Sequence, residues 1–173
     1  MNDLTETVTY ERICGTVASL LFLFARIENE TRDIIALARG ADSLAGLHGA
    51  RGTLRVWWDL LRADREARPY EALLADQLWA QIQEPLDVRN GICHGLMGAF
   101  SSRGDEPATL TWRMYGGTNS KTYDELQAMF AWLSKIPQAM SMISHAVGAR
   151  DVAELRSLPD RDFWTKEFGI EFD

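Results

Sequence analysis

The sequence predicts an all-α protein: an antiparallel bundle of four long helices, with a small β hairpin or strand between the third and fourth helices and a short helical tail. Apolar residues recur at steps of three and four along most of the chain, as they do on one face of a helix. The pattern lapses over residues 99 to 121, where turn residues and a strand-like alternation replace it. The 173 residues, 46% hydrophobic and 25% charged, are enough to bury the core of one domain.

The first two helices are predicted to end at a glycine and before a proline. The first runs from about Thr5 to Ala38 and ends at Gly40. The second runs from about Ser43, as N-cap, to Ala67 before Pro69. The predicted buried face of the first helix is Ile13, Val17, Leu20, Leu21, Phe24, Ile35 and Ala38, and that of the second is Leu47, Ala50, Leu54, Trp57 and Leu61.

One acidic residue interrupts the apolar face of the first helix. Continuing that face along the helix predicts buried positions at Glu28 and Thr31. A buried carboxylate needs a cationic or hydrogen-bonding partner. Two partners are open for Glu28: Arg89, whose guanidinium it would orient, and Arg32, four residues further on.

The opposite side of the second helix is basic. It carries Arg51, Arg55, Trp58 and Arg62. Arginines beside a stacking aromatic ring are typical of surfaces that bind RNA, so these residues are candidates for substrate binding. The alternative is a solvated helix face on which the arginines form ion pairs with Asp59, Asp64 and Glu66.

The third helix is predicted from Tyr70, with Leu73, Leu74, Leu78 and Ile82 buried and with a kink or break at Pro85. A strand from Thr109 to Tyr115 follows, to which residues 96–100 could pair as a hairpin. Residues 116–119, Gly-Gly-Thr-Asn, should close this excursion.

The fourth helix is predicted to begin near Thr122 and to continue to Val147, with a kink at Pro137. Thr122 and Glu125 have the spacing of a capping box. Residues 1–148 would then form the bundle, and residues 149–173 an appendage of one or two short helices packed on the bundle or on a partner. The expected anchors of the appendage are Phe163, Trp164 and Phe168.

Composition limits the possible functions. A net charge of −7 argues against binding nucleic acid by bulk electrostatics, so any RNA contact must be local. The two cysteines, Cys14 and Cys93, lie far apart, and no metal-ligand spacing occurs, so we expect no disulfide, metal or cofactor. The N-terminus lacks a signal pattern, and the apolar run at residues 20–25 is too short to span a bilayer. We therefore expect a soluble, cytoplasmic protein that does not enter membranes.

The densest chemistry lies in the heptapeptide RNGICHG, residues 89–95. In a helix, Asn90 and His94 project from nearly one face, and the long side chain of Arg89 can reach the same neighbourhood. Gly91 and Gly95, also four apart, each cost roughly 1 kcal/mol of helix propensity. That cost suggests that they allow another backbone to come close.

An arginine, a polar residue directly after it and a histidine five positions after the arginine resemble the signature of the HEPN superfamily (higher eukaryotes and prokaryotes nucleotide-binding). The resemblance covers roughly residues 5–147. It implies a helical bundle that carries the signature on its third helix and dimerises so that two signatures face each other. Many members are metal-independent endoribonucleases of toxin-antitoxin and phage-defence systems, so an antitoxin protein is a possible partner. Some toxins of the family carry a modified tyrosine two residues after the histidine; here that position is Leu96, so regulation by that route is not expected.

The resemblance implies catalytic roles for Arg89, Asn90 and His94. Metal-independent RNA cleavage needs a base for the ribose 2′-hydroxyl, positive charge on the phosphate, and an acid for the leaving oxygen. Histidine can serve as base or acid, and arginine grips phosphate through two donors. One copy supplies too few groups, so we expect a homodimer that shares the site between subunits.

Three alternatives accompany this prediction. His94 could be a hydrogen-bonded structural histidine and Arg89 a salt-bridged residue. The module could bind RNA, a nucleotide or a protein without turnover. A Cys93 nucleophile is disfavoured because neighbours in a helix point about 100° apart. His48 and His145 are isolated and are predicted to be structural or surface residues.

Overall fold

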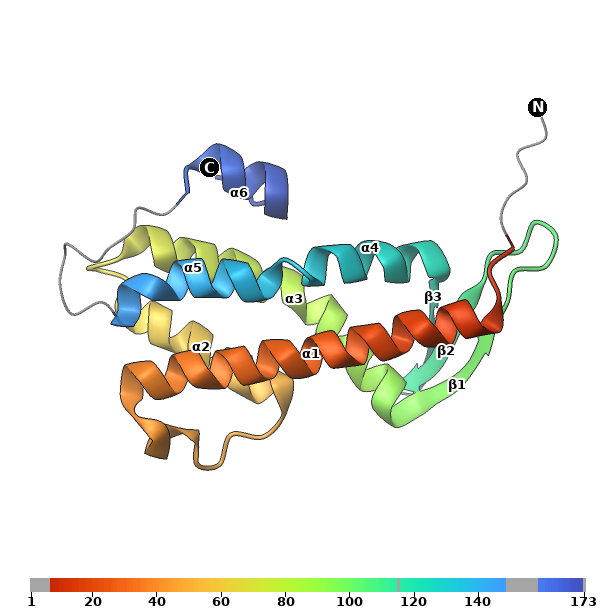
Figure 1. Cartoon of the computed structure of the whole chain (residues 1–173), viewed down its shortest axis with the longest axis horizontal. Coiled ribbons are helices and arrows are strands. Elements are labelled where there is room, and N and C mark those ends of the chain that lie inside the picture. Colours follow the sequence, from red (N-terminus) through yellow and green to blue (C-terminus); the bar gives the residue numbers. More distant parts are fainter. Residues whose placement is uncertain (1–6, 115, 149–158, 173) are drawn as a thin grey trace. The chain divides into compact units, whose positions relative to one another are not determined.

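The computed structural model describes residues 7–114, 116–148 and 159–172, and within them the fold is mostly helical with one small antiparallel sheet (Figure 1). The chain divides into two compact units. The first contains the residues up to Leu23 together with Glu84–Leu133, and the second contains Phe24–Gln83 and the residues from Ser134 on. Helices α1 and α3 each contribute to both units, and each unit is described by itself below.

The elements follow one another along the chain in a fixed order. They are α1 (Tyr10–Arg39), the 3₁₀ helix η1 (Ala41–Leu44), α2 (Gly49–Ala63), α3 (Pro69–Gly95), β1 (Leu96–Phe100), β2 (Thr109–Met114), β3 (Gly117–Thr122), α4 (Tyr123–Leu133), α5 (Ile136–Gly148) and α6 (Arg161–Phe168). Among the described residues, no helix combines the length and the apolar character needed to cross a membrane.

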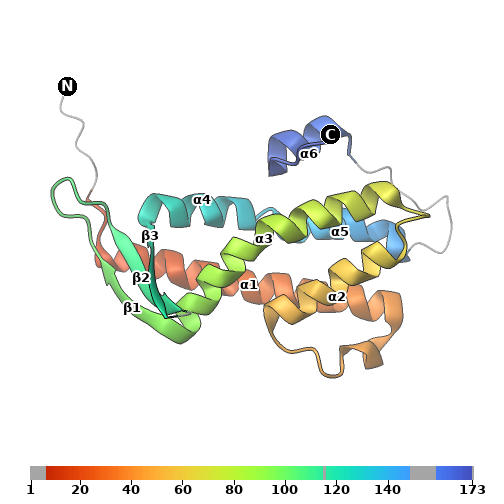
Figure 2. The same cartoon turned by 180° about the vertical axis from the view of Figure 1, so that it is seen from behind.

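The first unit is built around the sheet. The strand order is β1-β2-β3 with both pairs antiparallel, and β1 follows the last turn of α3 without a loop (Figures 1 and 2). Leu110 and Trp112 of β2 are buried and Met114 is half-buried. Arg113, which lies between Trp112 and Met114, is exposed. The expected alternation of β2 and its pairing with residues 96–100 are therefore confirmed.

The sheet has one strand more than the sequence predicted. Residues 116–119 were expected to close the excursion, but Gly117–Thr122 pairs along the whole of β2, with Trp112 opposite Asn119. Most of β3 is exposed. Its residues therefore show no apolar alternation, which is the signal by which a half-buried strand is recognised.

In the second unit, buried side chains of α1, α2, α3 and α5 form the core. The indole Nε1 of Trp57, fully buried on α2, donates to Ser144 Oγ of α5 at 2.7 Å. Helix α6 packs on the same unit. Trp164 and Phe168 are buried as expected, Phe163 is half-buried, and Lys135 forms an ion pair with Glu167 at 2.9 Å.

The first helix begins and ends close to the prediction. Its buried face agrees with the prediction at Ile13, Leu20, Phe24 and Ile35, whereas the other three predicted positions, Val17, Leu21 and Ala38, are only half-buried. The helix starts at Tyr10, Thr5 lies outside the described residues, and it ends before Gly40 as expected. The buried positions are Ile13, Thr16, Leu20, Phe24, Ile27, Thr31 and Ile35. Glu28 therefore lies beside the buried face and not on it. Thr31 does lie on this face, where its hydroxyl donates to the Ile27 carbonyl at 2.6 Å.

The predicted start of the second helix at Ser43 is wrong. Ser43 lies in the 3₁₀ helix η1, and α2 begins only at Gly49. The physical reason is the pair Gly46 and Gly49, whose φ angles of 81° and 72° are incompatible with a continuous right-handed helix. The buried face of α2 agrees with the prediction at Ala50, Leu54, Trp57 and Leu61.

Pro85 and Pro137 have different effects on the helices that were predicted to contain them. Helix α3 continues through Pro85 to Gly95, so of the predicted kink or break at Pro85 the break does not occur. Proline removes one helical hydrogen bond, and Leu86 and Val88 directly after it are buried, which compensates for that loss. The predicted single fourth helix, in contrast, is two helices, because α4 ends at Leu133 and α5 begins at Ile136, next to Pro137.

Candidate active site

The three residues of the signature lie on the last two turns of α3, in the first unit. Arg89 and Asn90 are half-buried, and His94 is exposed. Arg89 Nη1 donates to the side-chain oxygen Oδ1 of Asn90 at 3.0 Å. The helix is continuous over these residues, so Asn90 and His94 lie four residues apart, on neighbouring positions of one face.

The hydrogen bond between Arg89 and Asn90 leaves much of their donor capacity available. A guanidinium carries five N–H donors, and an amide carries two. The Asn90 carbonyl therefore holds the guanidinium while the remaining donors of both residues can bind an anion. Such a fork of donors matches the geometry of a phosphate group or of a carboxylate.

The two glycines of the signature have a structural reason, and it lies within the chain. A Cβ atom at Gly91 would overlap the indole ring of Trp112, and one at Gly95 would overlap the carbonyl oxygen of Arg113. The predicted close approach of another backbone is therefore confirmed at Gly95, and the backbone is that of β2. These contacts fix the last turns of α3, and hence the signature, against the sheet.

Of the two partners that the sequence left open for Glu28, the structure shows Arg32. The Glu28 carboxylate accepts a hydrogen bond from Arg32 Nη2 at 3.3 Å, and the same nitrogen donates to the Leu47 carbonyl at 2.6 Å. All three residues belong to the second unit. A pairing of Glu28 with Arg89 would join the two units and stays a prediction.

The basic face of α2 forms contacts within the second unit. The Trp58 ring stacks on Trp79 with centroids 5.3 Å apart, and the Arg62 guanidinium lies 4.5 Å from the Trp58 centroid. Trp58 Nε1 donates to Asp76 Oδ1 at 2.7 Å, and Arg62 and Arg65 form ion pairs with the same carboxylate.

These contacts support the ion-pair interpretation of this face, with a partner that the sequence did not suggest. Asp76 of α3 is the acceptor shared by Trp58, Arg62 and Arg65. Of the three acidic partners expected, Asp64 forms an ion pair with Arg68 at 3.4 Å. Arg55 is exposed and Arg51 is half-buried. RNA binding by this face stays a prediction.

The remaining candidates do not form a second site. Cys14 and Cys93 are free and exposed, and His48 and His145 are exposed. In the part of the chain that the structure describes, no three His, Cys, Asp or Glu side chains are grouped so that they could hold a metal ion.

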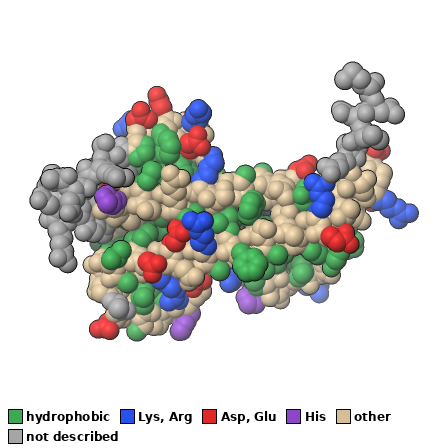
Figure 3. All heavy atoms as spheres, in the orientation of Figure 1, with side chains coloured by type: hydrophobic (Ala, Val, Ile, Leu, Met, Phe, Trp, Pro, Cys, Tyr) green, Lys and Arg blue, Asp and Glu red, His purple; other side chains and the backbone are tan. Residues whose placement is uncertain are grey.

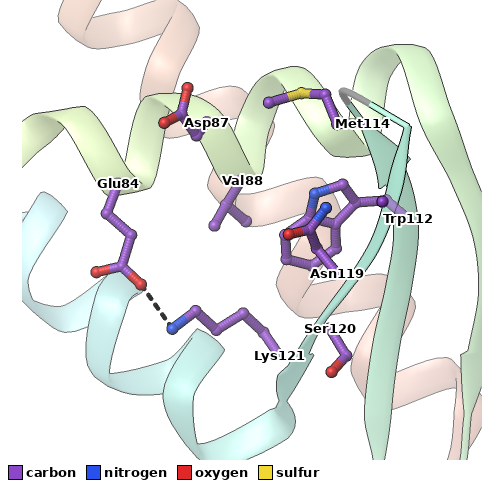
Figure 4. A pocket seen from close by; sticks show the side chains of 9 residues that line it. Glu84, Asp87, Val88, Trp112, Met114, Asn119, Ser120 and Lys121 are labelled. Carbon is purple, nitrogen blue, oxygen red and sulfur yellow. Dashed lines mark ion pairs between the residues drawn. The ribbon is translucent and has the colours of Figure 1, made fainter.

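Sequence reasoning missed a cavity next to the signature. Glu84, Asp87 and Val88 of α3 line it together with residues of β2 and β3 (Figure 4). Asp87 precedes Asn90 by three residues and His94 by seven, so helical spacing could have placed it on their face. Lys121, on the opposite wall, could not be found because β3 was not predicted.

Comparisons of the chain with family models, with curated proteins and with solved structures found no match. Membership of the HEPN superfamily stays a prediction from the signature.

Proposed function

We propose that this chain is a metal-independent endoribonuclease of the HEPN type, a toxin or phage-defence component that acts in the cytoplasm and whose four-helix bundle forms a homodimer. The observation that carries the proposal is the arrangement of the signature on α3. A half-buried arginine held by its neighbouring amide lies on the same two turns of α3 as a solvent-exposed histidine. These are the groups that cleavage at a phosphodiester requires.

The proposed reaction is an internal transfer at phosphorus. The ribose 2′-oxygen attacks the adjacent phosphorus, and His94 of one copy takes its proton. The bond from phosphorus to the 5′-oxygen breaks, and His94 of the other copy returns a proton to that oxygen. The Arg89 guanidinium and the Asn90 amide neutralise the charge that develops on the phosphoryl oxygens. The products are a 2′,3′-cyclic phosphate and a 5′-hydroxyl.

A shared site requires a surface for a second copy, and the residues after His94 provide a candidate. Leu96, Met97 and Phe100 of β1 are 51%, 59% and 56% exposed, an unusual exposure for large apolar side chains. Figure 3 shows hydrophobic side chains (green) over β1 and over the first half of α1. β1 is also an edge of the sheet, with backbone groups available for pairing. A second copy that covers this surface would bring its own signature close to the first.

The test is cleavage of total RNA by the purified protein, by His94→Ala and by His48→Ala. His48 is the matched control because it is an exposed histidine at the start of α2 whose side chain makes no capping hydrogen bond. We expect His94→Ala to lose cleavage while its circular dichroism and dimer mass stay unchanged, and EDTA to have no effect.

Four results would contradict the proposal. Equal RNA degradation by the wild type and His94→Ala would mean that the histidine has no catalytic role. EDTA inhibition that added metal reverses would indicate another mechanism, as would a 5′-phosphate product. RNA binding without any turnover would favour the noncatalytic module.

A further inference from the structure

The N-terminal half of α1 has an outer face without charge. Residues 13–25 include no charged side chain, although 25% of the chain is charged. A helix face in contact with water normally carries charged residues. One side of this segment is nevertheless exposed, and its exposed residues are Cys14, Gly15, Ala18, Ser19, Phe22 and Ala25. Figure 3 shows hydrophobic side chains (green) on this face of α1.

The uncharged face has one large projection and one hollow. Phe22 is 78% exposed, whereas a phenylalanine is normally buried in the core. At Gly15, apart from its chain neighbours and the backbone of its own helix, no atom lies within 4 Å of the position that a Cβ would occupy. The two residues are about 10 Å apart along the helix axis. Such a pair can fit together when a second copy of the surface is turned by 180°.

Residues of opposite charge stand at the two ends of this face. Glu11 is exposed in the first turn of α1, and hydrogen bonds from its own backbone N–H and from Thr9 lower the pKa of its carboxyl group, which is therefore ionised at neutral pH. At the other end, the Arg26 side chain is 67% exposed and forms an ion pair through Nε with Glu30 at 2.7 Å. A guanidinium carries five N–H donors, so Arg26 can bind a second carboxylate.

Six exposed residues form one line along the helix, which we call the α1 stripe: Glu11, Gly15, Ala18, Ser19, Phe22 and Arg26. Helix α1 is continuous over all of them, so at about 100° per residue they project within a sector roughly 100° wide. The midpoint of the stripe lies between Ala18 and Ser19. Glu11 and Arg26 are equally far from this midpoint. The same is true of Gly15 and Phe22.

We infer that the α1 stripe is the surface on which a second copy of this chain packs, with the two α1 helices antiparallel. A twofold axis then passes between Ala18 and Ser19, and these small residues let the helices come close. Glu11 of each copy faces Arg26 of the other. Phe22 of each copy faces Gly15 of the other, where no side chain stands in its way.

The symmetry of the stripe identifies the partner as a second copy. In a twofold dimer, every contact between two different residues occurs twice, once on each side of the axis. A surface that serves such a dimer must therefore be complementary to itself, and the α1 stripe is complementary in both charge and size. Its uncharged centre and charged ends also match the usual composition of protein interfaces, in which charged residues are depleted at the core.

The inference names the interface of the homodimer proposed above, and it rests on that proposal for the role of the dimer in catalysis. In an antiparallel pair, the twofold axis is perpendicular to both helices and passes between them. In Figures 1 and 2, the end of α3 lies level with the middle of the N-terminal half of α1. The axis therefore runs toward the end of α3, where His94 lies, and relates it to His94 of the second copy. The exposed Leu96 and Met97, which follow on β1, then belong to the same interface.

The first experiment reverses the charges at the ends of the stripe and measures the dissociation constant of the dimer by analytical ultracentrifugation of the full chain. Glu11→Arg or Arg26→Glu places a like-charged pair in both symmetry-related contacts. Each variant should raise the dissociation constant by roughly tenfold or more. Asp33→Arg is the matched control, because Asp33 is an exposed acidic residue of the same helix about two turns beyond the stripe. We expect it to leave the dissociation constant unchanged.

Mixing the two charge variants tests the antiparallel arrangement. A heterodimer of Glu11→Arg with Arg26→Glu has opposite charges in both contacts, whereas each variant alone has like charges in both. We expect the mixture to dimerise about as tightly as the wild type. A variant that was weakened by a folding defect would not be rescued by mixing. A mixture that dimerised no better than the separate variants would overturn the inference.

The second experiment removes the projection at the centre of each contact. Phe22→Ala should raise the dissociation constant by roughly a hundredfold or more, since each dimer buries this side chain twice. Circular dichroism should stay unchanged, because Phe22 is exposed in the single chain. Leu37→Ala is the control, since Leu37 is 84% exposed on the same helix but lies beyond the end of the partner helix in this arrangement. Equal effects of the two substitutions would overturn the inference.

RNA cleavage distinguishes a failure of this interface from a failure of the ribonuclease function. Loss of cleavage in each charge variant and its return on mixing would support both. A dimer that is unaffected by these variants and cleaves RNA through His94 would overturn the α1 interface and leave the ribonuclease function intact. A dimer that responds as expected but does not cleave RNA would support the interface and contradict the ribonuclease function. A monomeric wild type would overturn the inference.

Discussion

Gly95, the last residue of α3, lies against the carbonyl oxygen of Arg113 in β2, so closely that no side chain fits between them. One turn earlier, Gly91 lies against the Trp112 ring in the same way. The signature is thus held by contacts that only glycine allows. The glycines of the signature hold it against β2, and its catalytic residues are proposed to act on RNA. Substitutions can test the two roles separately.

Alanine at either glycine should destabilise the protein, and Gly95→Ala should do so more. The Arg113 carbonyl belongs to the backbone of a central strand and cannot move independently, whereas the Trp112 ring can shift slightly. Overpacking of this kind costs about 1–3 kcal/mol. The free energy of unfolding by urea measures it.

Gly15→Ala is the control for these two substitutions. Gly15 is also a helical glycine, but apart from its chain neighbours and the backbone of its own helix no atom lies within 4 Å of the position of its Cβ. Alanine there should stabilise the protein by about 0.5–1 kcal/mol, since it only improves helix propensity. A similar stability change for Gly15→Ala and Gly95→Ala would show that the contact with β2 is not tight.

Asn90 should hold Arg89 in place as well as contact the phosphate, and two substitutions test these roles. Asn90→Ala removes the acceptor for Arg89 Nη1 and should lower kcat/KM for RNA by roughly tenfold to a hundredfold. Asn90→Asp keeps an acceptor but places a negative charge where the phosphate should bind. We expect Asn90→Asp to be less active than Asn90→Ala, mainly through KM. If Asn90→Asp retained wild-type activity, phosphate could not bind at this position.

The signature illustrates what local sequence predicts and what it does not. The helical spacing of Asn90 and His94 and the need for a close approach at Gly95 follow from local geometry, and both are confirmed. The identity of the approaching backbone depends on the sheet. Lys121 could not be foreseen, because β3 is exposed and its sequence lacks an alternating pattern.

In the helices, too, local features could be predicted from the sequence, whereas features that depend on neighbouring elements could not. The capping box of Thr122 and Glu125 is local, and the structure confirms both of its hydrogen bonds. The buried face of α1 passes through Ile27, so Glu28 pairs with Arg32 at its edge. Whether the buried face of a long helix passes through one residue or the next depends on the elements packed against it. Sequence periodicity alone does not determine this choice.

The capping box should make stability depend on pH. The Thr122 backbone N–H donates to Glu125 at 2.7 Å, and this hydrogen bond is the main reason that the pKa of Glu125 is lowered. A carboxyl group whose pKa is lower in the folded than in the unfolded protein stabilises the folded state. This contribution is complete above the ordinary pKa of about 4.3 and is lost as the pH falls through the pKa of the folded protein. The stability difference between wild type and Glu125→Gln should therefore shrink below about pH 4.

Thermal unfolding between pH 3 and pH 7 measures this difference. Glu106→Gln is the control, because Glu106 is exposed and lies in a turn outside the box. A stability gap between wild type and Glu125→Gln that widened as the pH fell would contradict the assigned role of the carboxylate.

The exposed apolar side chains of β1 should hold the dimer. Met97→Asp places an unpaired charge in the proposed interface and should raise the dissociation constant roughly 30-fold or more, since central interface residues commonly contribute about 2 kcal/mol or more. Light scattering should then show a shift toward the monomer mass of 19.5 kDa, together with loss of RNA cleavage. Leu37→Asp is the control, because Leu37 is 84% exposed on α1 but belongs to the second unit. If the wild type were monomeric at concentrations at which it cleaves RNA, the shared site would be wrong.

The basic face of α2 can be tested by comparing two arginines that differ in their contacts. Arg55 is exposed, whereas Arg62 lies over the Trp58 ring and pairs with Asp76 at 3.7 Å. If this face binds RNA, Arg55→Ala should weaken RNA binding without changing the melting temperature. The slope of the logarithm of the affinity against the logarithm of the salt concentration should fall by about the amount expected for one phosphate contact. Arg62→Ala should also lower stability by about 0.5–1 kcal/mol through loss of the cation–π contact. Binding is measured in the His94→Ala background, so that the RNA stays intact. An RNA affinity that Arg55→Ala leaves unchanged would restrict this face to the ion pairs and ring contacts it makes within the second unit.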